Sequence, residues 1–282
     1  MYDQEITRTH RTAFVIAVDQ SGSMQESILF AGHHVAKAQA VAVIVGAMID
    51  ELVMRSRFCD EHRNYYDVAV IGYSNTSVYS LLDFEGFVPV TMLAQCQVPQ
   101  VELRFDDEPS AEGPASLTYS EWIKPRAEGE TPMYETLATI YDMVGRWCNE
   151  PQNRDSFPPM VFNITDGEAS DCDEASLLRM AERLRATSTR NGSTLLVNTH
   201  LSSDPKAKAL LFPTPSEVPH GVDKVNLLEQ MSSLLPEPFN AAVESVRLTP
   251  STPPYLAMAY NASAADAFSI INIGSYSATY IR

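Results

Sequence analysis

The sequence is poor in basic residues, with 20 Lys and Arg against 36 Asp and Glu and a formal net charge of −16. A polyanion of this size repels phosphate backbones and anionic lipids, which argues against nucleic-acid binding and membrane-surface binding. The same charge attracts metal cations. Hydrophobic residues make up 45% of the chain, a composition typical of ordered globular proteins and not of disordered ones.

Sequence features of secreted and membrane proteins are missing as well. The four cysteines have no C-x-x-C spacing and no secretory framework, which favours a reducing, cytoplasmic compartment. The N-terminal residues lack the apolar core of a signal peptide. The longest apolar stretch, residues 40–49, is roughly half as long as a membrane span. We therefore expect a soluble protein with no membrane partner.

Hydrophobic patterns predict an α/β fold. Short, continuously apolar segments are typical of parallel strands buried on both faces, and residues 78–84 return after one of them as an antiparallel edge partner. The buried strands are expected at 13–18, 66–73, 160–165 and 194–199, with a further strand at 255–260. Helices are expected at 33–57, 131–147, 175–190, 222–235 and 264–273. This order predicts a doubly wound, mostly parallel sheet with one antiparallel edge strand and helices on both faces.

The chain is expected to form one domain over residues 1–282. Residues 85–128 are acidic, contain proline and lack periodicity, so we interpret them as an elaborated insert, with short strand-like pieces at 101–105 and 121–124. A less regular C-terminal extension begins at about residue 205. Loops of this kind carry specificity in many proteins, so we expect partner recognition in these two regions.

Oxygen-bearing side chains follow the predicted strands at the points where they end. Asp19, Ser21 and Ser23 come directly after the strand at 13–18, Thr131 begins a helix, and Asp166 directly follows the strand at 160–165. Loops at the carboxyl ends of neighbouring parallel strands converge in one crevice of the sheet. We therefore expect these five residues to surround one point.

The donor atoms of this group suit a hard divalent cation. Carboxylates and hydroxyls favour Mg²⁺ or Mn²⁺ over Zn²⁺. Only Asp19 and Asp166 carry charge, so they offset the two charges of the ion, while the hydroxyls coordinate without adding charge. An ion held in this way keeps an open position, and a carboxylate from a partner protein can complete its octahedron.

These residues match the pattern D-x-S-x-S, then Thr, then Asp, and the sequence resembles the von Willebrand factor A domains at their metal-ion-dependent adhesion site. The resemblance covers residues 13 to about 201. It implies a Rossmann-like sheet and a metal held by Asp19, Ser21, Ser23, Thr131 and Asp166, with Ser21 and Ser23 as direct ligands. It also implies Mg²⁺ or Mn²⁺, with Ca²⁺ as a further candidate, and a protein partner that offers an acidic residue.

The resemblance further implies a non-catalytic interaction module that acts as an adaptor or scaffold. The spellings VDQSGSM and GETPM are similar to those of stand-alone bacterial A domains linked to tellurite resistance, which implies a bacterial stress-response or signalling system. One alternative is a structural subunit of a larger assembly. Another is a Mg²⁺-dependent phosphate-ester hydrolase with Asp19 as nucleophile, but such enzymes need a second Asp where this chain has Ser21. Motifs of nucleotide-binding loops and of serine-hydrolase elbows are absent.

Simpler interpretations exist for several of these residues. Asp19, Asp166 and Thr131 can all cap helix N-termini. Glu130, Glu168 and Asp171 lie near the expected metal face, where they can orient water or contact a partner, but solvated surface acids are the simpler interpretation. The pair at 33–34 is interpreted as the start of the first helix and not as a metal site.

Overall fold

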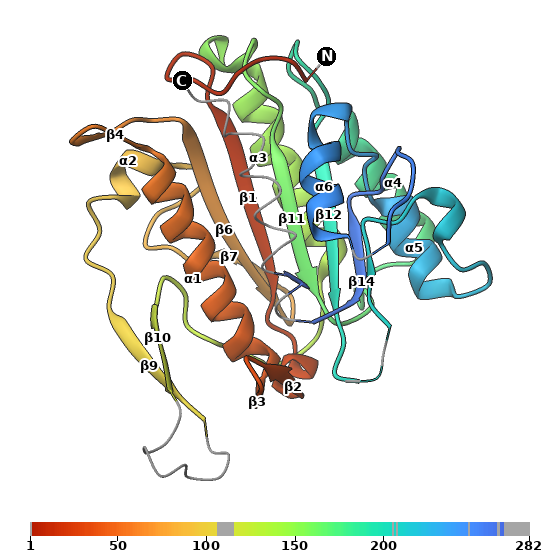
Figure 1. Ribbon diagram of the computed structural model, residues 1–282. Helices are drawn as coiled ribbons and strands as arrows, with labels where there is room; N and C mark the ends of the chain where they lie inside the picture. Colours follow the sequence, from red (N-terminus) through yellow and green to blue (C-terminus); the bar gives the residue numbers. More distant parts are fainter. Residues whose placement is uncertain are drawn as a thin grey trace.

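A central β-sheet organises the chain in a computed structural model that describes residues 2–105, 116–204, 206, 208–247, 249–263 and 266–267. Its strands in these residues are β1 (Thr12–Asp19), β6 (Tyr66–Ser74), β7 (Ser77–Ser80), β8 (Val88–Pro89), β11 (Met160–Thr165), β12 (Leu195–Leu201), β13 (Leu210–Leu211) and β14 (Met258–Ala262). The strand order is β13-β14-β12-β11-β1-β6-β7, and β8 also pairs with β6 (Figure 1).

The middle of the sheet is parallel and its edges are antiparallel. β1 lies between β6 and β11, β11 also pairs with β12, and β12 pairs with β14, all in parallel. β7 and β8 pair with β6 antiparallel, and β13 pairs with β14 antiparallel. The predicted fold class, including the antiparallel strand after β6, is confirmed. The antiparallel strands β8 and β13 were not anticipated.

Helices cover both faces of this sheet. They are α1 (Lys37–Arg55), α2 (Val90–Leu93), α3 (Met133–Asn149), α4 (Glu174–Ala186), α5 (Asp223–Met231) and α6 (Asn240–Val246), with short 3-10 turns η1 (Gly22–Gln25), η2 (Pro151–Asn153), η3 (Pro215–Glu217) and η4 (Glu237–Phe239). In Figure 1, α1 and α6 lie in front of the sheet and α3 and α4 lie behind it. No helix of the described residues is long and apolar enough to cross a membrane.

Three small hairpins lie outside the main sheet. They are β2 (Ser27–Phe30) with β3 (His33–Ala36), β4 (Arg57–Phe58) with β5 (Glu61–His62), and β9 (Gln100–Arg104) with β10 (Ser116–Ser120). The third hairpin belongs to the insert expected at 85–128, where a strand was expected at 121–124. The structure instead places that strand at β10. The domain boundaries of the insert and of the extension after about 205 stay a prediction.

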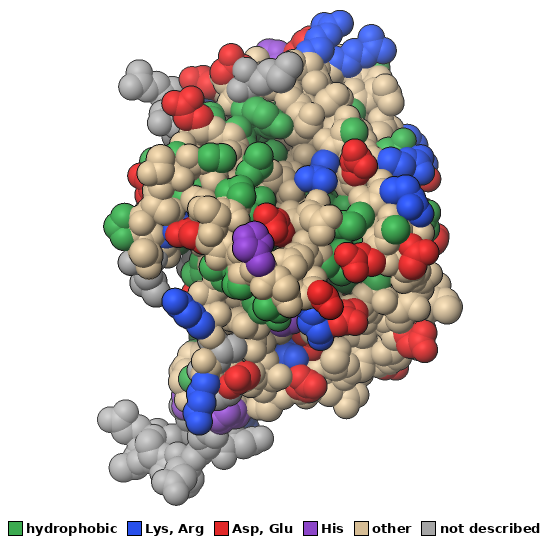
Figure 2. All heavy atoms as spheres, turned by 90° about the vertical axis from the view of Figure 1, so that its right-hand side faces the viewer, with side chains coloured by type: hydrophobic (Ala, Val, Ile, Leu, Met, Phe, Trp, Pro, Cys, Tyr) green, Lys and Arg blue, Asp and Glu red, His purple; other side chains and the backbone are tan. Residues whose placement is uncertain are grey.

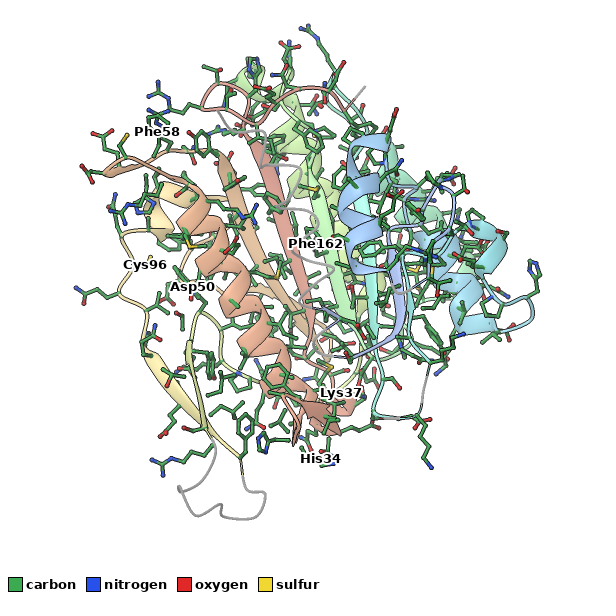
Figure 3. All side chains as sticks on the ribbon, in the orientation of Figure 1. His34, Lys37, Asp50, Phe58, Cys96 and Phe162 are labelled. Carbon is green, nitrogen blue, oxygen red and sulfur yellow. The ribbon has the colours of Figure 1, made fainter. Side chains whose placement is uncertain are left out.

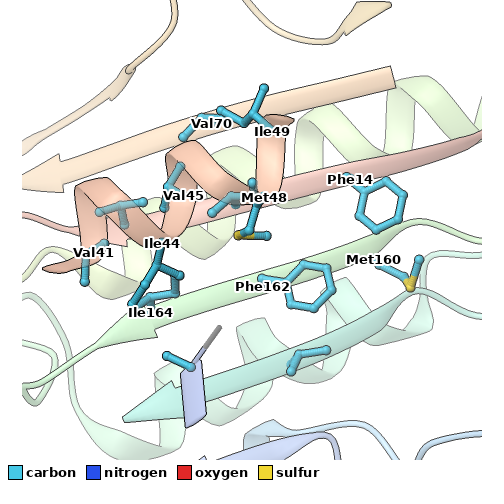
Figure 4. Packing of buried hydrophobic residues seen from close by; sticks show 14 of the residues in the cluster. Phe14, Val41, Ile44, Val45, Met48, Ile49, Val70, Met160, Phe162 and Ile164 are labelled. Atoms are coloured by element: carbon cyan, nitrogen blue, oxygen red, sulfur yellow. The ribbon is translucent and has the colours of Figure 1, made fainter. Parts of the chain in front are cut away.

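Every residue of β1 and β6 is buried because helices cover both faces of these strands. On β1, Phe14, Ile16 and Val18 pack in the cluster that contains α1, whereas Ala13, Val15 and Ala17 pack in the cluster that contains α3 and α4. Figure 4 shows part of the first cluster, with Ile44 and Met48 of α1 and with Phe14 and Phe162 of the sheet. Full burial of side chains of this size contributes about 1.5–3 kcal/mol each. This core fixes where β1 and β11 end.

The prediction of a helix at 33–57 is wrong for the first turn. Residues 33–36 form β3, and the helix begins at Lys37. Ala31 and Gly32, with φ of 52° and 87°, make the two-residue turn of the β2–β3 hairpin. The ring of His33 stacks on that of Phe105 at 4.1 Å. The change matters because it makes Lys37 the first residue of α1.

Other expected helices differ at their ends or lie elsewhere. α3 begins two residues after Thr131, so Thr131 precedes the helix. α6 was not anticipated, because the sequence around it resembles a proline-containing loop. The helix expected at 264–273 lies outside the described residues except at 266–267.

Candidate metal centre

Three loops converge at the carboxyl edge of the sheet, which is the lower edge in Figure 1. Asp19 ends β1 and Asp166 directly follows β11. The first loop is bonded to the loop before α3: the backbone N–H of Gly22 donates to the carbonyl of Gly129 at 2.9 Å. Gly129 has a φ of +74°, and a Cβ there would overlap the side chain of Asn75. This glycine therefore allows the loop before α3 to approach Asn75 in the turn between β6 and β7.

Asp19 is fully buried and is held by neutral donors. Its Oδ1 accepts from the backbone N–H of Ser21 at 2.8 Å, and its Oδ2 accepts from the hydroxyl of Thr165 at 2.7 Å. Burial raises the pKa of Asp19, and the charge of nearby Asp166 adds to this rise. A positive ion beside the carboxylate would reverse both effects.

Hydroxyls connect Asp19 to the second carboxylate. Ser21 Oγ lies 3.1 Å from Ser23 Oγ, and Ser23 Oγ donates to Asp166 Oδ1 at 2.6 Å. The side chain of Asp166 is fully buried. Neither serine hydroxyl pairs with an imidazole base in the part of the chain that the structure describes.

Thr131 completes the group through the space beside Gly167. A Cβ built on Gly167 would lie 3.5 Å from Thr131 Oγ1 and 3.9 Å from Ser23 Oγ. The two hydroxyls thus border one small space that a side chain at this position would fill. All five residues expected at the site are brought together, although they come from three loops that are far apart in the sequence.

The loop that follows β11 also fixes the start of α3. Asp171 accepts the backbone N–H groups of Tyr134 and Glu135 at 3.1 and 3.0 Å, so it caps this helix. Glu168 is exposed and pairs with Lys224 at 3.1 Å. By contrast, the oxygens of Asp166 go to Ser23 and to a lysine, so helix capping does not account for this residue.

That lysine, Lys37, was missed by the sequence reasoning. Its Nζ lies 2.6 Å from Asp166 Oδ2 and 2.7 Å from Glu26 Oε2, and the side chain is 3% exposed. Figure 3 shows Lys37 at the end of α1 that faces the carboxyl edge. The hydrogen bond from Lys37 is the main reason why the pKa of Glu26 is lowered. A signal existed, because Lys37 is the only charged residue between residues 35 and 49.

The donor set fits a hard divalent cation. It consists of two buried carboxylates and three hydroxyls, and the buried acid with a raised pKa gains most from a nearby positive charge. Within the described ranges, no three His, Cys, Asp or Glu side chains lie close enough together to hold a metal ion. A metal at this edge therefore depends on the serine and threonine hydroxyls.

Comparisons with known proteins give resemblances of fold. No family model matches the chain, and no curated protein matches it. Among solved structures, it is similar to a von Willebrand factor type A protein from Catenulispora acidiphila, at 14% identity and a TM-score of 0.41 over 69% of this chain and 34% of that one. It is also similar to proximal thread matrix protein 1 from the mussel byssus, described with a zinc-occupied MIDAS motif, at 11% identity and a TM-score of 0.49 over 94% of this chain and 47% of that one.

A third likeness is to the SpRpn10 VWA domain, at 11% identity and a TM-score of 0.40 over 79% of this chain and 83% of that domain. The chain thus spans less than half the length of the first two proteins. At such identities and TM-scores, neither a ligand nor a partner is carried over to this chain. The case for a metal rests on the geometry of its own residues.

Proposed function

We propose that this chain is a non-catalytic module that binds a partner protein through a divalent metal ion. Asp19, Ser21, Ser23, Thr131 and Asp166 would hold the ion, with Mg²⁺ or Mn²⁺ preferred and Ca²⁺ as a further candidate. The observation that carries the proposal is the convergence of these five oxygen donors at one edge of the sheet. The resemblance of their pattern to a metal-ion-dependent adhesion site supports it.

Charge explains why an ion would serve recognition here. With a net charge of −16, the chain repels an acidic partner. An ion with two positive charges, offset by only two carboxylates, keeps room for a third carboxylate from the partner. Figure 2 shows one face of the molecule, on which acidic and basic side chains are interspersed. The described residues of that face form no extended basic patch of the kind that binds nucleic acid.

A groove beside the site gives the partner a second surface. It has a volume of about 660 Å³ and is lined by residues of the β7 region and of the insert, among them Tyr79, Trp122 and Arg126. Gln20, the neighbour of Asp19, also lines it and accepts a hydrogen bond from the hydroxyl of Tyr79 at 2.6 Å. This continuity from the metal loop to the insert supports a role of the insert in specificity.

The test is affinity capture from a lysate of the source organism. The tagged chain is compared in Mg²⁺, in EDTA, and as a Ser21→Ala/Ser23→Ala variant whose fold is checked by circular dichroism. A Ser245→Ala variant, which changes an exposed serine of α6, is the control. We expect a partner that is retained only by wild type and by the control in Mg²⁺, because only then is the ion held.

Two outcomes would contradict the proposal. Retention of the same partner under all conditions would show that the site does not mediate the contact and would favour a subunit of a permanent assembly. Mg²⁺-dependent hydrolysis of a generic phosphate ester, lost on Asp19→Asn, would instead show an enzyme.

The four cysteines are unpaired in the structure, which agrees with a reducing compartment. A cytoplasmic location and a bacterial stress-response role stay predictions.

A further inference from the structure

Lys37 is a buried cation placed directly on one of the carboxylates of the candidate metal site. Its ammonium contacts Asp166 at 2.6 Å and Glu26 at 2.7 Å, and only 3% of its side chain is exposed. The hairpin β2–β3 and the first turn of α1 fix its position, because the backbone N–H of Lys37 donates to the carbonyl of Glu26 at 2.9 Å. The ammonium is therefore held at the site by the fold and is not a side chain that reaches it by chance.

This contact changes the charge that a metal ion would meet. Asp19 and Asp166 together supply two negative charges, and an ammonium on Asp166 offsets one of them. A divalent ion that binds Asp166 also meets the repulsion of a cation bonded to the same carboxylate, and in a buried setting this repulsion is only weakly screened. Lys37 in this position disfavours the ion that the oxygen donors favour.

The ammonium has a second partner that a metal ion would leave untouched. Glu26 contacts the same Nζ, its side chain is 55% exposed, and its Oε2 also accepts from the hydroxyl of Ser203 at 2.9 Å. An ammonium has three donors, so it can weaken its bond to Asp166 and remain paired with Glu26. Glu26 is thus a second carboxylate that can pair with the ammonium of Lys37 when the bond to Asp166 weakens.

We propose that Lys37 is a tethered cation that competes with the divalent ion for Asp166, and that Glu26 accepts it when the ion binds. This inference rests on the proposed metal site. The competition makes the site weak for metal alone. A partner carboxylate that completes the coordination of the ion then shifts the balance, so that metal and partner bind more tightly together than either does alone.

The experiment is a titration of the purified chain with Mn²⁺ alone, in which free Mn²⁺ is measured by electron paramagnetic resonance. Lys37→Met removes the charge and keeps an apolar side chain of similar length. We expect it to bind Mn²⁺ about tenfold more tightly than wild type. Lys224→Met is the matched control: it also removes one positive charge near this edge, but Lys224 contacts Glu168 and not Asp166. We expect its affinity to stay within about twofold of wild type.

A second variant tests the role of Glu26 separately. Glu26→Gln weakens the alternative partner of the ammonium, so we expect Mn²⁺ to bind roughly threefold more weakly than to wild type. In the Lys37→Met background the same substitution should have almost no effect, because Glu26 acts through the lysine. Such non-additivity would not arise if Glu26 merely added negative charge near the site.

The outcomes separate this inference from the proposed function. If Lys37→Met binds Mn²⁺ as wild type does, or more weakly, then competition by Lys37 is wrong while the metal site stands. If neither protein binds Mn²⁺ although both are folded, the proposed metal site fails and the competition fails with it. If Lys37→Met does not fold, Glu26→Gln decides: an affinity equal to or tighter than that of wild type overturns the inference.

Discussion

The two ends of the sheet both bury carboxylates, but they treat them differently. At the amino edge, Asp67 on β6 forms an ion pair with Arg11, whose Nε lies 2.9 Å from Oδ2, and accepts a hydrogen bond from the indole N–H of Trp147 at 2.8 Å. At the carboxyl edge, Asp19 accepts from the backbone N–H of Ser21 and from the hydroxyl of Thr165, which are both neutral donors. Asp166 pairs with a lysine that has a second carboxylate within reach. The amino edge thus holds Asp67 with fixed partners, whereas the carboxyl edge holds Asp19 with neutral donors and Asp166 with a lysine that can exchange partners.

This difference separates an acid that supports the fold from acids available to a ligand. The partners of Asp67 come from the segment before β1 and from α3, so the carboxylate ties three parts of the chain together. Burial raises the pKa of Asp19, and no ion pair with this carboxylate is seen among the described residues. At neutral pH its buried charge is therefore destabilising, and an added cation would offset this cost.

The largest expected effect is at the amino edge. Asp67→Ala leaves the indole N–H of Trp147 without its acceptor and Arg11 without its ionic partner, so we expect a loss of about 3 kcal/mol in the free energy of unfolding. Urea denaturation measures it, with or without Mg²⁺. Asp155→Ala is the control, because Asp155 pairs with Arg190 on the surface and such pairs contribute less than about 1 kcal/mol. Equal losses in both variants would show that Asp67 has no special role.

Loss of a buried carboxylate at the carboxyl edge should, by contrast, not destabilise the fold when no metal is bound. Asp19→Asn removes a buried charge with a raised pKa and keeps an acceptor oxygen, so we expect no loss of stability in EDTA. Wild type should gain about 2.7 kcal/mol when the metal concentration is 100 times its dissociation constant, and the variant should gain nothing. Urea denaturation in EDTA and in Mn²⁺ measures both. Destabilisation of Asp19→Asn by several kcal/mol in EDTA would mean that this acid, like Asp67, supports the fold.

The sequence predicted where the strands end at the carboxyl edge because the signals for strand ends are local. Short apolar runs that stop at Asp19 and Asp166 mark both the buried strands and their ends, and parallel pairing then brings the ends together. The same reasoning could not find the pairing of Lys37 with Asp166, since Lys37 begins a helix and does not follow a strand, so that no strand pairing places it beside Asp166. It also depends on the hairpin at 27–36, where no strand was expected and the start of a helix was placed at residue 33.

The amino edge was not anticipated at all, for a related reason. Asp67 lies inside an apolar strand and Arg11 in an irregular segment, and nothing in their spacing shows that Trp147 reaches the same point. Buried ion pairs between distant segments depend on how helices sit on the sheet. Helix α6 was missed because it is short and follows prolines. Local patterns thus predict where strands end, but not which distant side chains meet there.

The smallest effect concerns pH and again distinguishes the carboxyl edge. His200 on β12 stacks on Tyr260 with ring centroids 4.7 Å apart, and burial lowers its pKa to about 4. Between about pH 4 and pH 6.5 the unfolded chain therefore binds a proton that the folded chain does not. The contribution of His200 is complete above about pH 6.5 and is lost as the pH falls towards 4, with about 2.5 kcal/mol of it gone at pH 4.5. His200→Phe keeps a ring against Tyr260 and cannot be protonated, so urea denaturation at pH 7 and pH 4.5 should show a smaller loss for the variant. Equal losses in both proteins would show that His200 is protonated as readily in the folded chain as in the unfolded one, and that the acid sensitivity of this edge comes from its carboxylates alone.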